Sequence, residues 1–224
     1  MPLFYAVATA TVKALLASLT RWEVKGRENV PRNGPLIVVS NHLSMVDPPL
    51  LSASVPRRIF FMAKEELFSS RGGAFIRWLG AFPVRRGTPD RRAIRQAMQV
   101  LERGQTLGMF PEGRRSLNHQ MNEAEFGVAM IALRSGVSIL PTGICGSENV
   151  KWPGFIWRRP RITVTIGQPF SLPRNEGKLT REQLIQATSL IMGHIAEVLP
   201  PGYRGIWECR VQGSGVHGWG GEEP

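Results

Sequence analysis

Short apolar runs that alternate with segments of helical character constrain the fold of this 224-residue chain more than any other feature. The apolar runs, which predict strands, are Trp22–Lys25, Leu36–Ser40, Ile59–Ala63, Thr106–Phe110, Ser138–Thr142 and Arg161–Ile166. The segments that predict helices are Pro48–Ser54, Gly73–Leu79, Pro89–Glu102, Phe126–Ser135 and Thr180–Val198. Strands that alternate with helices build layered α/β domains. We therefore expect one α/β domain over residues 21–204, with a central mixed sheet flanked by helices.

Residues beside the predicted helices support their boundaries. Thr88 is a suitable N-cap before Pro89, because proline is well tolerated in the first helical turn. Gly104 and Gly136 lie just past predicted helix ends, where a left-handed backbone is favoured.

Residues 1–20 are apolar and rich in small side chains, with Lys13 as their only charge. They lack the basic start of a secretory signal, and the run is short for a membrane span. Their helical spacing fits a helix in the membrane interface, with Lys13 and Arg21 reaching the headgroups. A helix packed on its own domain is the alternative. We expect residues 1–20 to form a membrane-associating helix.

Two further segments lie outside the pattern of strands and helices. Lys151–Pro160 contains Trp152, Phe155 and Trp157, and it is expected to be an irregular exposed insertion. Its aromatic side chains suit either a membrane interface or core packing. Residues 205–224 are expected to be a flexible tail, because their last stretch is rich in glycine.

The charge balance is strongly basic, since Lys and Arg number 28, Asp and Glu number 17, and the net charge is +11. Such an excess attracts acidic membranes, acidic carrier proteins, phosphorylated substrates or nucleic acids. No nucleic-acid-binding module is recognisable, so we expect no nucleic-acid partner. Cys145 and Cys209 are isolated and form no ligand cluster with the histidines, which predicts a reduced, cytosolic compartment and no metal site.

A histidine and an aspartate follow the strand Leu36–Ser40, with four residues between His42 and Asp47. The end of a strand in an α/β sheet is where ligands bind. A tight loop would bring the Asp47 carboxylate to one imidazole nitrogen and leave the other nitrogen to accept a proton. By spacing alone, the favoured interpretation is a structural histidine and an aspartate that caps the next helix.

Basic residues follow two other apolar segments. The strand Thr106–Phe110 runs into Pro-Glu-Gly-Arg-Arg-Ser, and within Gly80–Gly87 an apolar stretch runs into Arg85 and Arg86. A phosphate held near a general base accounts for this arrangement, and solvated surface turns are the alternative.

Together these motifs resemble the glycerolipid acyltransferase family. The Asn-His-(four residues)-Asp motif of that family is matched by Asn41–Asp47. Its glycine-to-arginine motif is matched by Gly80–Gly87, with Arg86 as the key arginine. Its Phe-Pro-Glu-Gly-Thr-Arg-Ser motif is matched by Phe110–Ser116, and its apolar-proline step by Leu140–Thr142. The four motifs occur in the family's order and span about half the chain.

The resemblance implies an acyl transfer from acyl-CoA or acyl carrier protein to 1-acyl-sn-glycerol-3-phosphate, giving phosphatidic acid. His42 would be the general base and Asp47 its orienting partner. The lysophospholipid phosphate would bind Lys64, Arg86 and Arg115, with Glu112 and Gly113 shaping or contacting the substrate site. The acyl donor is a cosubstrate, and no cofactor is expected.

One residue departs from the family pattern, because Arg114 stands where the family has threonine. This change leaves the acceptor open between lysophosphatidic acid, glycerol-3-phosphate and another lysophospholipid. The expected location is the cytoplasmic face of a membrane, as a peripheral or monotopic protein.

Two other classes of function fit the sequence less well. A non-enzymatic, basic membrane-binding protein leaves His42, Asp47 and Glu112 without a purpose. A serine hydrolase would require a Gly-x-Ser-x-Gly elbow, which the sequence lacks.

Overall fold

A computed structural model describes residues 3–69, 73–78, 80–85, 90–151 and 154–209. These residues form one mixed seven-stranded sheet with the strand order β1-β7-β6-β2-β5-β3-β4. The strands are β1 (Arg21–Lys25), β2 (Leu36–Ser40), β3 (Ile59–Lys64), β4 (Phe82–Val84), β5 (Thr106–Met109), β6 (Ile139–Cys145) and β7 (Arg161–Ile166). Among the described strands, β6 and β7 pair antiparallel and the other pairs are parallel.

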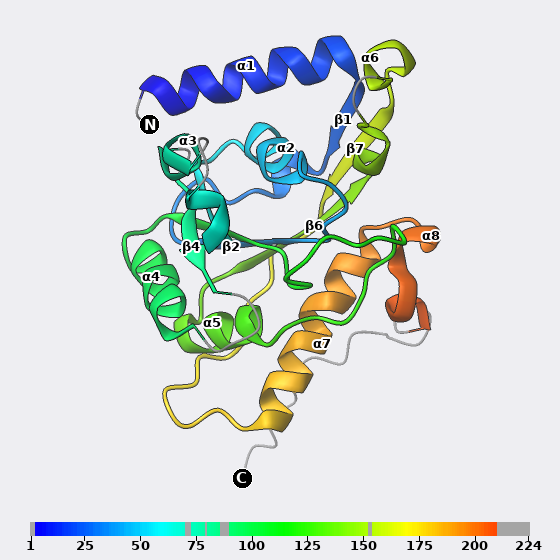
Figure 1. The fold of residues 1–224 in the computed structure, drawn as a ribbon. Coiled ribbons are helices and arrows are strands. Elements are labelled where there is room, and N and C mark those ends of the chain that lie inside the picture. The colour runs from blue at the N-terminus through cyan, green and yellow to red at the C-terminus, as the bar shows by residue number, and fades with distance from the viewer. Residues whose placement is uncertain (1–2, 70–72, 79, 86–89, 152–153, 210–224) are drawn as a thin grey trace.

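Helices cover both faces of the sheet. They are α1 (Leu3–Leu19), α2 (Asp47–Ser54), α3 (Gly73–Trp78), α4 (Arg91–Glu102), α5 (Gly127–Ser135), α6 (Phe155–Arg158), α7 (Arg181–Glu197) and α8 (Pro201–Arg204). In Figure 1, α1 and α2 lie above the sheet, and α4, α5 and α7 lie below it. Four short 3-10 helices complete the description: η1 (Arg27–Asn29), η2 (Glu65–Phe68), η3 (Ser147–Asn149) and η4 (Gly205–Trp207). The α/β class and the single mixed sheet flanked by helices are thus confirmed.

The central strand β2 is buried on both faces, as expected for a parallel strand between two helical layers. Its side chains alternate between two apolar cores. Ile37 and Val39 pack in the core beneath α4, α5 and α7, and Leu36 and Val38 pack in the core beneath α2. This burial fixes the register of β2 and therefore the point at which the chain leaves the sheet.

Every predicted strand is present, and β2 and β7 have the predicted bounds. Strand β4 was missed. It has three residues, pairs only with β3 among the described strands, and contains Pro83. Proline cannot donate to a ladder and is tolerated at a sheet edge, which is where β4 lies.

The predicted helix ends are confirmed in part. Gly104 and Gly136 have φ of 69° and 63°, so both adopt the expected left-handed backbone. Helix α4, however, begins at Arg91 and is capped by Asp90, whose Oδ1 accepts N–H bonds from Arg92 and Ala93 at 3.0 Å each. Residues 88 and 89, where the cap was expected, lie outside the described residues.

Two segments expected to be irregular contain helical turns. Within the expected insertion Lys151–Pro160, α6 is a short helix, although its Trp157 is 88% exposed. Within the expected tail, η4 carries the buried Trp207, while residues 210–224 lie outside the described part.

The N-terminal segment is helical, and one side of α1 packs on the domain. Tyr5 is buried, and its hydroxyl accepts the N–H of Ile59 at 3.2 Å. The residues exposed on α1 carry no charge: Ala6, Val7, Ala10, Thr11, Ala14, Leu15, Ala17 and Ser18. None of the helices in the described residues has the length and apolar character that crossing a membrane requires.

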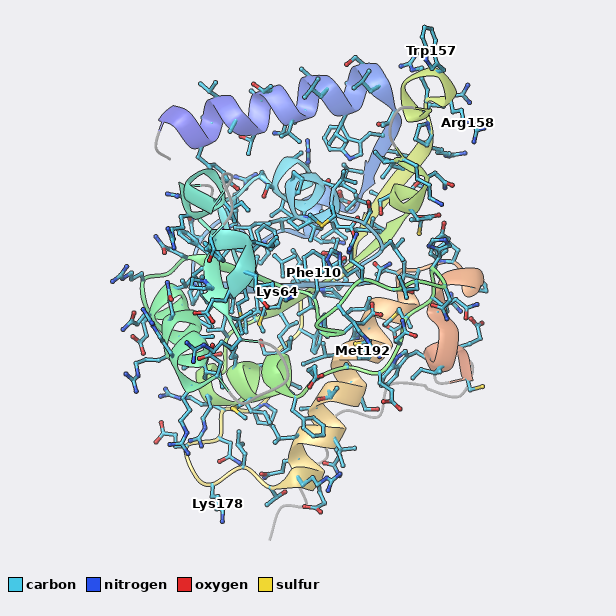
Figure 2. The ribbon with its side chains drawn as sticks, in the orientation of Figure 1. Lys64, Phe110, Trp157, Arg158, Lys178 and Met192 are labelled. Atoms are coloured by element: carbon cyan, nitrogen blue, oxygen red, sulfur yellow. The ribbon has the colours of Figure 1, made fainter. Side chains whose placement is uncertain are left out.

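The edge strands β1 and β7 join this N-terminal helix to α6. Arg21 of β1 is in register with Arg161 of β7, and the Arg21 N–H donates to the carbonyl of Pro160 at 2.9 Å. Arg159 also donates to the carbonyl of Ala17, near the end of α1, at 3.3 Å. Figure 2 shows Trp157 and Arg158 at the tip of the molecule beyond this end of α1.

Candidate active site

Polar loops follow two adjacent parallel strands at the centre of the sheet. Strand β2 pairs with β5 from Leu36–Thr106 to Val39–Met109, so both strands end at the same edge. The loop with His42 and Asp47 follows β2, and the loop with Glu112 follows β5. This edge is the usual ligand side of an α/β sheet.

Asn41 fixes the exit of the chain from β2. Its Nδ2 donates to the carbonyl of Ile144 at 2.9 Å, and its Oδ1 accepts the N–H of Ile144 at 2.8 Å. The side-chain amide thus continues the pairing with β6 where the β2 backbone departs. Asn41 is 1% exposed, so neither bond competes with water.

His42 and Asp47 are in direct contact, with 2.8 Å between Nδ1 and Oδ2. The same oxygen accepts the backbone N–H groups of Leu43 and Ser44 at 2.7 Å each. Asp47 is fully buried. The expectation that Asp47 caps the next helix is wrong, because the N-cap position belongs to Val46 and the carboxylate faces the preceding loop.

The imidazole ring of His42 is held from a second side by stacking. Its centroid lies 4.1 Å from that of Phe110, with 20° between the planes, and Phe61 stacks beyond Phe110 at 6.1 Å. A carboxylate can only accept, so the Asp47 contact places the ring proton on Nδ1. Nε2 contacts no hydrogen-bond partner among the described residues and is left as a proton acceptor.

Glu112 links the two loops from a buried position, since it is 3% exposed. Its Oε1 accepts the N–H of His42 at 3.3 Å, and its Oε2 accepts two N–H bonds from Asn122 at 3.1 and 3.2 Å. Burial raises the pKa of Glu112, and these donors oppose that rise. No arginine among the described residues forms an ion pair with Glu112, and its carboxylate braces the two loops.

Two other contacts shape the loop after β5. The N–H of Ser116 donates to the carbonyl of His42 at 2.8 Å, which is a second link between the loops. Gly113 closes a turn by donating to the carbonyl of Phe110 at 3.0 Å, with φ of 66°. A side chain at this left-handed position would be strained.

Two of the three expected phosphate-binding residues, Lys64 and Arg115, lie at or after strand ends on the same edge. Lys64 ends β3, the strand beside β5, and its Nζ lies 3.0 Å from Glu66 Oε1 (Figure 2). Arg114 and Arg115 are exposed and form no ion pair with another described residue. Arg86 lies outside the described residues. The structure therefore brings His42, Asp47 and Glu112 into one hydrogen-bonded group, with Lys64 and Arg115 near it in the topology but not in contact.

Other chemistries find little support at this edge. Among the described residues, no group of three His, Cys, Asp or Glu side chains is placed to hold a metal ion. Burial beside Glu148 raises the pKa of Cys145 to about 12, so its thiol stays protonated and is a poor nucleophile.

Comparison with known proteins agrees with this geometry. A model of the family described as acyltransferase matches residues 21–145, which include the loop with His42 and Asp47 and the loop with Glu112. The chain belongs to the acyltransferase family. The chain is 33% identical over 167 residues to a 1-acyl-sn-glycerol-3-phosphate acyltransferase from Streptococcus pneumoniae, covering 70% of this chain and 61% of that protein.

A lyso-ornithine lipid O-acyltransferase from Pseudomonas aeruginosa is 33% identical over 151 residues, covering 60% of this chain and 56% of that protein. The chain thus spans about three-fifths of the length of these two relatives. Among solved structures, the 1-acyl-sn-glycerophosphate acyltransferase PlsC from Thermotoga maritima superposes with a TM-score of 0.66 at 29% identity, covering 84% of this chain and 76% of that one.

Replacing Asp47 with asparagine should separate the catalytic pair from ordinary loop bracing. Asp90 is a matched control, because its carboxylate accepts backbone N–H groups, as that of Asp47 does, but contacts no histidine. Its donors are the N–H groups of Arg85, Arg92 and Ala93. We expect both Asp47→Asn and Asp90→Asn to lower the free energy of unfolding, by about 1–2 kcal/mol each. Only Asp47→Asn should lower kcat, by about 10²-fold or more. Equal kcat values in the two variants would contradict an orienting role for Asp47.

Proposed function

We propose that this acyltransferase transfers a fatty acyl group from a thioester donor to the free hydroxyl of 1-acyl-sn-glycerol-3-phosphate, giving phosphatidic acid. The observation that carries the proposal is the contact of His42 with Asp47, which leaves Nε2 free at the catalytic edge. The names of the relatives from S. pneumoniae and T. maritima support the same acceptor.

In the proposed mechanism, His42 Nε2 removes the proton from the acceptor hydroxyl as its oxygen attacks the thioester carbonyl carbon. The imidazolium that forms is stabilised by the Asp47 carboxylate 2.8 Å from Nδ1. The tetrahedral intermediate collapses by breaking the carbon–sulfur bond, and His42 returns its proton to the departing thiolate. The products are the ester and a free thiol, without an acyl-enzyme.

The acceptor phosphate binds the basic residues around this edge in our proposal. Arg115 is exposed and unpaired with the described residues, so its guanidinium is available for a phosphate. Arg86 completes the set by its position in the glycine-to-arginine motif, and Lys64 by its resemblance to a family position that meets the substrate phosphate. Holding the phosphate orients the neighbouring hydroxyl toward Nε2, which converts binding energy into orientation.

We also propose that the protein sits on the cytoplasmic face of a membrane through α1. The uncharged outer side of α1 ends beside α6, where Trp157 is 88% exposed. An amphipathic aromatic ring is favoured where lipid meets water. Exposed Arg158 and Arg159 beside it suit anionic headgroups. Peripheral binding of this kind would give the enzyme access to a lipid acceptor without a membrane span.

Replacing His42 with alanine tests the central proposal. A matched control is His194→Ala, because His194 Nδ1 also pairs with a carboxylate, Glu197 Oε2 at 3.0 Å, but on α7. We expect His42→Ala to lower kcat by about 10²–10⁴-fold with little change in acceptor binding, and His194→Ala to retain activity. The assay measures product from labelled lysophosphatidic acid, with acyl-CoA and acyl carrier protein donors run in parallel.

The same assay decides the acceptor and the donor. Glycerol-3-phosphate, other lysophospholipids and lyso-ornithine lipid are run as competing acceptors. Product from lysophosphatidic acid alone supports the proposal, and faster turnover of another acceptor would replace it. Vesicle binding without any acyl transfer would favour a non-enzymatic membrane protein.

Arg115→Ala should weaken the acceptor without slowing the chemical step. We expect its KM for the phosphorylated acceptor to rise about tenfold with kcat nearly unchanged, because in our proposal Lys64 and Arg86 still orient the phosphate once the acceptor is bound. Arg103→Ala is the control, since Arg103 is an exposed arginine at the far end of α4. An unchanged KM would remove Arg115 from the phosphate site.

A charge placed on the outer side of α1 should release the protein from membranes. Leu15 is 51% exposed on α1, and Ile185 is 47% exposed on α7 on the opposite face of the sheet. We expect Leu15→Glu to weaken binding to phosphatidylglycerol-containing vesicles severalfold in a flotation assay, and Ile185→Glu to leave it unchanged. Equal binding by both variants would refute the docking of α1.

A further inference from the structure

The C-terminal segment formed by α8 and η4 packs against the loop that follows β5. The Nε1–H of Trp207 donates to the carbonyl of Asn122 at 3.0 Å, and the N–H of Met121 donates to the carbonyl of Tyr203 at 2.8 Å. Between these contacts, Gly205 approaches so closely that a Cβ atom on it would lie 2.3 Å from the carbonyl oxygen of Met121. The segment therefore packs closely against Met121 and Asn122.

Asn122 passes this contact on to Glu112. Its backbone N–H and its side-chain Nδ2 both donate to Glu112 Oε2, at 3.1 and 3.2 Å, while its carbonyl accepts from Trp207. The other carboxylate oxygen, Oε1, accepts the N–H of His42 at 3.3 Å. A continuous path of hydrogen bonds thus runs from Trp207 through Asn122 and Glu112 to the backbone of His42.

Two residues of the path are buried, and Asn122 between them is half-buried. Trp207 is 8% exposed and belongs to the core beneath α7, and Glu112 is 3% exposed. A buried carboxylate must keep its donors, because water does not replace them. Glu112 receives its donors from both loops, so a displacement of Asn122 displaces the carboxylate and with it the His42 backbone.

We infer that Asn122 and Trp207 are positioning residues for His42, and that residues 201–207 complete the active site although they lie beyond the matched family region of residues 21–145. The inference rests on the proposed role of His42 as the base. Neither residue touches the reacting atoms, and their effect passes through Glu112. We call this hydrogen-bond path, formed by Trp207, Asn122 and Glu112, the Trp207 relay.

Trp207→Phe keeps an aromatic ring in the core but removes the indole N–H donor and part of the ring system, so its control must lose the same atoms. Its matched control is Trp22→Phe on β1, because the buried Nε1 of Trp22 donates no hydrogen bond to the described residues. We expect Trp207→Phe to lower kcat about tenfold with both KM values unchanged, which is the effect of about one hydrogen bond. Trp22→Phe should retain the kcat of the unmodified protein. The thermal transition of each variant is measured as well, because a structural defect that lowers the folded fraction would appear there.

A double-mutant cycle tests whether the two residues act in series. Asn122→Ala removes one donor to Glu112 and should lower kcat at least as much as Trp207→Phe. Adding Trp207→Phe to Asn122→Ala should then lower kcat by clearly less than the tenfold effect of Trp207→Phe alone. Fully multiplicative losses would show that Trp207 acts by another route and would overturn the relay.

Amide hydrogen exchange at His42, read by NMR, tests the relay without substrate. We expect faster exchange of the His42 amide in Trp207→Phe and in Asn122→Ala than in Trp22→Phe, because the N–H loses a fixed acceptor. Unchanged exchange would overturn the inference whatever the activity. If the unmodified protein transfers no acyl group to any acceptor, the proposed function fails, and the exchange rates still decide whether the relay positions His42.

Discussion

The geometry of the His42 loop depends on the hydrogen bonds that the buried carboxylate of Asp47 accepts. A charge with no exposed surface is tolerated only where donors replace its lost hydration. Oδ2 obtains them from the backbones of Leu43 and Ser44 and from Nδ1 of His42. Oδ1 is buried and has no hydrogen-bond partner among the described residues, so the charge depends on the three contacts of Oδ2. The same oxygen therefore holds the loop backbone and orients the imidazole of His42.

The neighbours of β2 complete this arrangement, and each contributes from a parallel strand end. From β6, the backbone of Ile144 holds the side chain of Asn41. From β5, Phe110 supports the ring of His42, and Glu112 and Ser116 hold its backbone. The raised pKa of Glu112 shows that its donors only partly offset the cost of burial. Acidification that protonates Glu112 would weaken the link between the loops, so the site is best braced when this carboxylate is ionised.

The sequence predicts the sheet well and the hydrogen-bond network poorly, for physical reasons. Strands β2 and β7 have the predicted bounds because apolar runs and alternation report burial directly. Strand β4 is too short for such a pattern and contains Pro83. The spacing of His42 and Asp47 indicates a pair, but a capping rule cannot tell which side of Asp47 its carboxylate will face. Asn122 lies in a loop and Trp207 in a short 3-10 helix 85 residues away, so no local pattern predicts their contact. The glycine-rich composition of the C-terminal residues likewise predicted a flexible tail, whereas η4, which carries Trp207, is a 3-10 helix.

The pairing of β1 with β7 has a consequence for how such enzymes diversify. These two strands form one margin of the sheet and bring α1 and α6 together, although Arg21 and Arg161 are separated by most of the chain. The loops that hold His42 and Glu112 arise from β2 and β5, with β6 standing between them and that margin. Substitutions on the outward surfaces of α1 and α6 are therefore insulated from the reaction chemistry. Selection can adapt this surface to a different cellular envelope while the catalytic machinery stays the same.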